Sequence, residues 1–332
     1  MADSKRQERR IKRIATCMVC LVICLLTSLC ACGGAEEKAG KDDGTLHIVT
    51  TIFPEYDWVR NILGENPGNA EVTLLLDSGV DPHSFQATTK DILDVSTCDL
   101  FIYVGGESDT WAEDALAEAV NPDMVVVNLL EVLGDQAKAE ERTEGMQGRA
   151  EEEPELDEHV WLSLRNAEVL CRAIEEGIAE IDPEHADIYE ENLEAYLGKL
   201  DDLDQEYIQA VSDAPVKTVL FGDRFPFRYL ADDYGLSYYA AFPGCSAETE
   251  ASFQTIRFLA GKLDELRLPC VLTIEGSDKK IAETIIQNTE SQDQEILGLN
   301  SMQSVTLEEA EEGASYIGIM KENLATLQQA LR

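Results

Sequence analysis

The sequence predicts an α/β protein: two α/β domains, each with a mainly parallel four-stranded sheet, joined by one long rigid α-helix. Apolar runs typical of buried strands alternate with helix-like segments four times before residue 130, and four more times after residue 215. Between the two sets, apolar side chains recur with a period of 3.6 residues from residue 184 to residue 211. With 332 residues, 44% of them apolar, the chain is long enough to bury two cores.

The segment from Met1 to Cys32 has the pattern of a lipoprotein signal peptide (1–32). Residues 5–13 are basic, and residues 14–29 form an apolar run that is too short for a comfortable membrane span. The run ends in Leu29-Cys30-Ala31-Cys32-Gly33, which resembles a bacterial lipobox with Cys32 as the lipidated residue. The alternative is an uncleaved anchor helix, and either interpretation places the rest of the chain outside the cytoplasm. A polar, flexible tether is expected over residues 33–45.

The charge distribution disfavours some classes of partner. The formal net charge is −39, and the segment up to Cys32 carries +4, from six basic and two acidic side chains, which leaves −43 on the remainder. A body this acidic is not expected to bind nucleic acid or an anionic membrane through its folded surface, whereas it is compatible with attracting cations. Most of these carboxylates are expected to do no more than solvate the surface.

The first domain is expected over residues 46–164. From residue 134 to residue 158 the composition is polar and acidic, and no periodicity survives. We therefore expect a mobile surface loop there, which either gathers cations weakly or is simply solvated. Upstream of the loop, helical segments separate four predicted strands, which begin at Leu46, Val72, Leu100 and Met124.

Linker helices are predicted over residues 165–212, followed by the second domain over residues 213–332. Asp182-Pro183 divides the helical stretch, with Asp182 as the cap and Pro183 as the first residue of the long helix. A helix of about 28 residues measures roughly 40 Å at 1.5 Å per residue, enough to connect two domains. The predicted strands of the second domain begin at Val216, Leu236, Cys270 and Glu295.

Two of the four histidines in the chain are candidate metal ligands. His83 lies in Asp81-Pro82-His83-Ser84-Phe85, directly after the turn that ends the strand at residues 72–76. His159 lies much further along the chain, in Asp157-Glu158-His159-Val160-Trp161. Neutral imidazole suits Zn²⁺ and neighbouring transition metals, so we interpret the two histidines as ligands of one shared ion. Zinc takes four ligands in most protein sites, so two histidines do not complete one.

The cysteines do not predict a second kind of site. Five of the nine lie at or before Cys32, and the other four form no C-x-x-C pair. A cysteine-rich zinc site and a disulfide framework are therefore not expected. Three of the four, Cys98, Cys171 and Cys270, sit among apolar residues and are expected to pack as small hydrophobic side chains; the fourth is Cys245.

Over residues 46–332 the chain resembles the metal-binding lipoproteins of bacterial ABC importers for zinc and manganese, the ZnuA/AdcA/TroA-like group. The resemblance implies two α/β domains joined by one rigid helix, with a metal cleft between them. The motifs that carry it are Asp81-Pro82-His83-Ser84-Phe85, Gly105-Gly106-Glu107 with Trp111, Glu158-His159-Val160-Trp161-Leu162, Asp182-Pro183 with Tyr189 and Asn192, and Ala247-Glu248-Thr249-Glu250-Ala251-Ser252.

The same resemblance implies a role in transport. The captured ion would be delivered to the ABC permease of a metal importer, with ATP hydrolysed on the cytoplasmic side. The expected cargo is Zn²⁺, with Mn²⁺ as the alternative, and the expected form is a monomer anchored to the bacterial membrane through lipid on Cys32. No catalytic residue is implied.

The resemblance further implies two ligands from the second domain, where the sequence departs from the pattern. A histidine or glutamate is implied just after that domain's first strand, but Gly222 stands in its place and Asp223 is the nearest candidate. A carboxylate is implied after the last strand, where Asn300 is a weaker, neutral donor. Glu275, at the end of the third strand, is the other candidate. Two histidines with carboxylates suit both zinc and manganese, so the ligands do not decide the metal.

Two other functions stay open: a surface adhesion or structural lipoprotein, and a secreted zinc hydrolase. A hydrolase needs an open metal position with a general base beside it. The sequence contains no H-E-x-x-H motif and no G-x-S-x-G motif. We therefore interpret the chain as a binding protein and not as an enzyme.

Overall fold

The computed structural model describes residues 44–148, 155–246 and 250–332. Residues Thr45 to Arg332 form one compact unit. The predicted signal peptide with Cys32, almost all of the tether, part of the acidic loop and three residues of one motif (247–249) lie outside the described residues. Among the helices that the structure describes, none combines the length and the apolar composition needed to cross a membrane.

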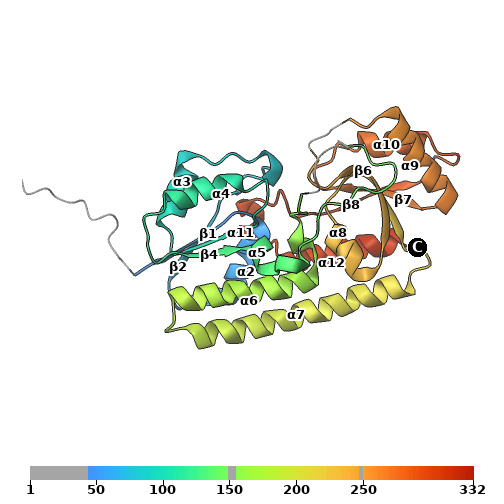
Figure 1. The fold of residues 1–332 in the computed structure, drawn as a ribbon. Coiled ribbons are helices and arrows are strands. Elements are labelled where there is room, and N and C mark those ends of the chain that lie inside the picture. The colour runs from blue at the N-terminus through green and yellow to red at the C-terminus, as the bar shows by residue number, and fades with distance from the viewer. Residues whose placement is uncertain (1–43, 149–154, 247–249) are drawn as a thin grey trace, which may run out of the picture. The chain divides into compact units, whose positions relative to one another are not determined.

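Two parallel four-stranded sheets form the frame of the fold, which confirms the predicted fold class (Figure 1). The first sheet has the order β2-β1-β3-β4, and Ile48 at its centre pairs with Val72 and Leu100. All four residues of β3 are buried, as expected for an inner strand covered on both faces. The strands are β1 (Leu46–Thr50), β2 (Ala70–Leu74), β3 (Leu100–Tyr103) and β4 (Val125–Asn128), and the helices are α2 (Phe53–Leu63), α3 (Thr89–Thr97), α4 (Thr110–Ala117) and α5 (Leu129–Leu133).

The second sheet has the order β6-β5-β7-β8 and is also parallel throughout. The pairing of β5 with β6 shifts register between Phe221 and Arg224, which marks a β-bulge at Gly222 and Asp223. Its strands are β5 (Thr218–Phe225), β6 (Ser237–Pro243), β7 (Cys270–Ile274) and β8 (Glu295–Leu299). Its helices are α8 (Arg228–Tyr234), α9 (Phe253–Leu266), α10 (Lys280–Gln287) and α12 (Tyr316–Ala330), whereas α11 (Leu307–Glu311) follows β8 in the sequence but contacts α2.

Two helices lie between the sheets in sequence, α6 (Leu164–Ile181) and α7 (Ala186–Asp213), and they pack side by side (Figure 1). The 28 residues of α7 reach elements of both sheets. Near its start, Asn192 Nδ2 donates to the Ile62 carbonyl of α2 at 2.9 Å. Near its end, the Tyr207 hydroxyl donates to the Met320 carbonyl of α12 at 2.7 Å. The long connecting helix was predicted from the 3.6-residue period.

The start of α7 differs from the prediction. The helix begins at Ala186 with His185 as its N-cap, so Pro183 is not its first residue. Asp182 does not cap it either, because its Oδ2 accepts hydrogen bonds from the Tyr189 hydroxyl at 2.6 Å and from His185 Nδ1 at 2.8 Å. Asp182 therefore ties the turn between the two helices to the first turn of α7.

Both sheets contribute to one continuous hydrophobic cluster, which includes Ile48 of β1 and Phe221 of β5. Within this cluster, Trp161 and Tyr316 form hydrogen bonds that link segments distant in the sequence. Trp161 Nε1 donates to the Ser301 carbonyl at 2.8 Å, and the Tyr316 hydroxyl donates to the Trp161 carbonyl at 2.6 Å. The predicted boundaries at residues 164 and 212 lie inside the compact unit Thr45–Arg332.

The first part of the predicted acidic loop, residues 134–148, is held against the second sheet and its helices. The Lys138 backbone N–H donates to the Tyr229 hydroxyl at 2.9 Å, and the Gln147 backbone N–H donates to the Ala241 carbonyl at 2.9 Å. Glu141 accepts from the Tyr238 hydroxyl at 3.2 Å. These bonds follow no sequence period, which is why the segment had the pattern of a mobile loop.

Candidate metal centre

His83 is positioned by a short capped turn that follows β2. It is the middle residue of the 3-10 helix η1 (Pro82–Ser84). The Asp81 carboxylate caps this turn by accepting the backbone N–H of His83 at 3.0 Å, and Pro82 supplies the fixed φ angle that its first position needs. The His83 side chain is only 11% exposed, so the turn delivers an imidazole into the interior of the unit.

His159 is a fully buried imidazole, and the carboxylate of Asp157 holds it in place. It directly precedes the 3-10 helix η3 (Val160–Leu162). Asp157 Oδ1 accepts the backbone N–H of His159 at 3.0 Å and lies 2.8 Å from its Nδ1. Because a carboxylate only accepts hydrogen bonds, Nδ1 carries the proton and Nε2 presents its lone pair. A carboxylate behind the imidazole is common at metal sites, where it fixes the tautomer and the ring orientation.

The two histidines meet although 76 positions separate them in the sequence. Their Nε2 atoms lie 3.3 Å apart, and the ring centroids are 5.3 Å apart in an edge-to-face arrangement. Two imidazoles on one tetrahedral zinc place their nitrogens about 3.3 Å apart, because each Zn–N bond is roughly 2.0–2.1 Å long. The pair therefore has the separation that a shared ion requires. Burial is the main reason that the pKa of His83 is lowered to about 3, and the adjacent imidazole of His159 further disfavours a positive charge there, so the His83 ring is neutral at pH 7.

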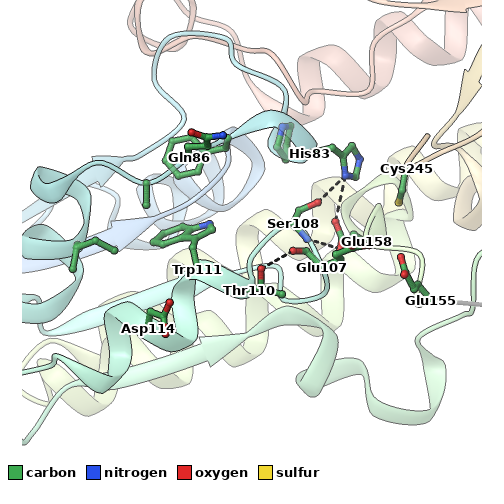
Figure 2. A pocket seen from close by; sticks show the side chains of 14 residues that line it. His83, Gln86, Glu107, Ser108, Thr110, Trp111, Asp114, Glu155, Glu158 and Cys245 are labelled. Atoms are coloured by element: carbon green, nitrogen blue, oxygen red, sulfur yellow. Dashed lines mark hydrogen bonds and ion pairs between the residues drawn. The ribbon is translucent and has the colours of Figure 1, made fainter. Parts of the chain in front are cut away.

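Ser108 and Glu158 hold the other side of the His83 ring (Figure 2). Ser108 Oγ lies 2.7 Å from His83 Nδ1, and Glu158 Oε2 lies 3.6 Å from the same atom. When Nδ1 donates its proton to Ser108, the Nε2 lone pairs of both histidines face each other, and a cation between them stabilises that arrangement. Gly106, with φ of 82°, leaves room for this network because a Cβ there would overlap the Glu158 side chain.

An ion pair connects the His83 turn to the second sheet. Arg224 Nη2, at the end of β5, donates to Asp81 Oδ2. Burial acts to raise the pKa of Asp81, but the hydrogen bond and the charge of Arg224 outweigh burial and lower this pKa. Arg224 thus supports the carboxylate that caps His83.

A cavity of about 640 Å³ opens beside the histidine pair, and His83 lies on its wall. Figure 2 shows Glu158 and Cys245 toward one end of this cavity and Trp111 and Asp114 toward the other. Two further carboxylates, Glu107 and Glu155, also line the cavity. A wall with four acidic side chains favours the entry of cations over anions.

The family model described as zinc-uptake complex component A periplasmic (ZnuA) matches residues 48–330, which is most of the chain. The chain belongs to the ZnuA family. The resemblance that the sequence motifs indicated is thereby confirmed.

Curated relatives agree with this assignment. The high-affinity zinc uptake system protein ZnuA of Bacillus subtilis is 30% identical over 304 residues, which are 91% of this chain and 93% of that protein. The zinc-binding lipoprotein AdcA of Streptococcus pneumoniae is 30% identical over 314 residues. That match covers 92% of this chain but only 60% of the length of AdcA.

Solved structures of related proteins share the fold. The metal-dependent lipoprotein YcdH of Bacillus subtilis is 30% identical with a TM-score of 0.70, and the match covers 86% of this chain and 99% of that one. The Zn(II)-bound ZnuA-like domain of Streptococcus pneumoniae AdcA is 28% identical with a TM-score of 0.68, and the match covers 87% and 99% of the two chains.

In this ZnuA family member, the group of clustered metal-binding side chains found among the described residues at the histidine pair does not include Asp223 or Glu275. Glu275 is engaged elsewhere, because its Oε1 accepts from Ser301 Oγ at 2.6 Å and its Oε2 accepts from the Ser301 backbone N–H at 2.7 Å. Asp223 lies in the bulge of β5, where its Oδ1 accepts the backbone N–H of Arg224 at 2.9 Å. Asn300 Oδ1 accepts the backbone N–H of Met302 at 2.8 Å.

The position of Gly222 explains why no ligand stands there. A Cβ on Gly222 would lie 2.7 Å from Ala282 Cα and 2.8 Å from Ala282 Cβ. The position therefore faces α10, and a histidine or a glutamate at this point of β5 would overlap that helix.

A third side chain, Cys245, lies beside the histidine pair in the structure. The sequence alone assigns no role to this residue. Among the described residues, one group of three metal-binding side chains has its ligand atoms within 4.8 Å of one another, and it consists of His83, His159 and Cys245. Burial, followed by the carboxylates of Asp157 and Glu158, raises the pKa of the Cys245 thiol. The available signal was its surroundings, since Cys245 follows the predicted strand that starts at Leu236 and is not embedded in an apolar run.

Proposed function

We propose that the chain is an extracytoplasmic, lipid-anchored solute-binding protein that captures Zn²⁺ between His83 and His159 and delivers it to an ABC importer. The observation that carries the proposal is the pair of Nε2 atoms 3.3 Å apart. Asp157 orients one ring and Ser108 contacts the other, so both donors are directed toward the same point before an ion arrives. Such preorganisation reduces the ordering cost of binding.

Three further observations support a carrier. The family model and the two zinc-binding relatives connect this type of chain with zinc uptake. The cavity beside His83 is lined with carboxylates and offers a route for a cation. The lipobox-like sequence around Cys32 supports anchoring near a membrane permease, and we propose that the anchored form is a monomer.

The adhesin alternative has weaker support. The laminin-binding adhesin Lmb of Streptococcus agalactiae shares the fold with a TM-score of 0.71, but it is 22% identical to this chain, so that likeness concerns the fold alone. An adhesive role would not require the histidines to meet, and a hydrolase would require a substrate that is turned over. We propose a carrier of the ion and not a catalyst.

The proposal is tested by competition between metals. The purified full chain is stripped with a chelator, exposed to equal concentrations of Zn²⁺ and Mn²⁺, desalted, and analysed for metal by mass spectrometry. We expect about one zinc per chain and little manganese, because imidazole suits zinc whereas Mn²⁺ favours carboxylate, carbonyl and water ligands. A chain that retains mainly manganese, or no transition metal, would contradict the proposed cargo.

A further inference from the structure

We propose that Cys245 is the third protein ligand of the captured ion. The inference rests on the proposed function and deepens it: the site is a His₂Cys site in which a thiolate replaces the second-domain carboxylates that the family resemblance implies. Three loops then converge on the ion, carrying His83 after β2, His159 before α6, and Cys245 after β6.

The geometry of the group supports a common ion. One ring nitrogen of each histidine and Cys245 Sγ all lie within 4.8 Å of one another. At bond lengths of about 2.3 Å for Zn–S and about 2.0–2.1 Å for Zn–N, a tetrahedral zinc places sulfur and nitrogen roughly 3.5 Å apart. A movement of at most about 1.5 Å in the Cys245 sulfur therefore suffices to complete the site.

The loop that carries Cys245 is built to lie directly on His159. A Cβ on Gly244 would lie 3.0 Å from His159 Cε1 and 3.1 Å from His159 Nδ1, so glycine at this position permits the close approach. On the other side, Glu140 Oε1 accepts the backbone N–H of Cys245 at 3.0 Å. These two contacts fix the loop independently of the thiol.

The remaining acidic side chains near the ion have other roles. Glu275 and Asp223 accept hydrogen bonds away from the histidine pair. Glu158 Oε1 accepts the Ser108 backbone N–H at 3.0 Å, and its Oε2 lies beside the ring nitrogen of His83 that faces away from His159. Glu158 thus supports His83, and the fourth tetrahedral position is left for water from the cavity.

A thiolate changes the metals that the site prefers. Soft sulfur ligands select zinc and other thiophilic ions, whereas manganese favours hard oxygen donors. A bound cation also deprotonates a thiol that coordinates it. A His₂Cys site is therefore expected to discriminate against manganese more strongly than a site of histidines and carboxylates.

Zinc-edge X-ray absorption on the full chain loaded with one equivalent of zinc tests the inference. We expect one sulfur neighbour at about 2.3 Å and nitrogen or oxygen neighbours at about 2.0–2.1 Å. In Cys245→Ser the sulfur neighbour should disappear, and zinc affinity should fall at least about 10- to 100-fold, since loss of a ligand costs no less than loss of a residue that supports one. Cys98→Ser is the matched control, because Cys98 is equally a free cysteine and is buried outside the group.

The outcomes separate this inference from the proposed function. Zinc that binds the wild-type chain without a sulfur neighbour would overturn the role of Cys245 and leave the zinc carrier standing. A sulfur neighbour that persists in Cys245→Ser would also overturn it, because the five cysteines at or before Cys32 are present in both proteins. A wild-type chain that binds no zinc would overturn both proposals. Even where Cys245→Ser fails to fold, a wild-type spectrum without a sulfur neighbour would by itself overturn the role of Cys245.

Discussion

Replacing both His83 and His159 with alanine is expected to abolish zinc binding. Each substitution removes one of the two preoriented Nε2 donors, and each alone should weaken binding by about 100-fold or more. Glu158 and Cys245 remain in the double variant, but two side chains are too few to complete a tetrahedral zinc site. Zinc affinity is measured by competition with a chromogenic chelator, using equal amounts of wild-type and variant chains.

The other two histidines supply matched controls of the same residue type. The His47 side chain is 52% exposed on β1, and the His185 side chain is bonded to Asp182 at the start of α7. His47→Ala should bind zinc within about twofold of wild type, because an exposed substitution shifts free energies by about 0.5 kcal/mol at most. His185→Ala should also bind zinc within about twofold of wild type, even if the substitution lowers the stability of the fold. Undiminished zinc binding in the double variant would place the ion elsewhere.

Trp161→Ala is expected to cause the largest loss of stability among single substitutions at the site, about 3–5 kcal/mol. The Trp161 side chain is fully buried in the shared hydrophobic cluster, and its ring lies 5.4 Å from that of His159. Its indole N–H also bonds the Ser301 carbonyl after β8. Removal of the ring leaves a cavity at the junction of the two sheets. The free energy of unfolding is measured by guanidinium titration of the metal-free chain.

Two companion variants separate the causes of this loss. Trp161→Phe keeps most of the apolar volume but leaves the Ser301 carbonyl without its donor, so a loss of about 1–3 kcal/mol is expected. Leu93→Ala removes an exposed apolar side chain on α3 (59% exposed) and should change stability by about 0.5 kcal/mol or less. If Trp161→Ala cost no more than Leu93→Ala, the indole would not be the anchor described here.

Local sequence patterns predicted the fold because its determinants are local. The apolar runs of β1 and β3 and the 3.6-residue period of α7 follow directly from which faces are buried. The start of α7 was misplaced because Asp182 bonds Tyr189 and His185 instead of capping the helix, and sequence spacing does not reveal that choice. The segment 134–148 escaped prediction for the same reason, since its contacts are hydrogen bonds to distant residues.

Only the part of the candidate site that comes from the first domain could be predicted from the sequence. His83 and His159 stand in motifs with carboxylates at fixed offsets, Asp81 and Asp157, and the structure uses both carboxylates to orient those histidines. The second-domain half depends on tertiary geometry. The bulge in β5 and the packing of Gly222 against α10 arise from contacts between separate elements, which no local sequence pattern reveals.

The proposed role of Cys245 could not be predicted from the sequence either. Its lack of a C-x-x-C partner argued against a metal role in the sequence, because the other two ligands of the proposed site come from different segments of the chain. Folding brings the three segments together where β6 ends, at the carboxyl edge where parallel sheets usually place their ligands.

Crystallography of the zinc-loaded full chain, with anomalous diffraction recorded on both sides of the zinc absorption edge, tests the central claim most directly. We predict one strong zinc peak within about 2.0–2.1 Å of His83 Nε2 and of His159 Nε2. Zinc peaks found only at surface carboxylates, with the two Nε2 atoms still facing each other and no peak between them, would contradict it.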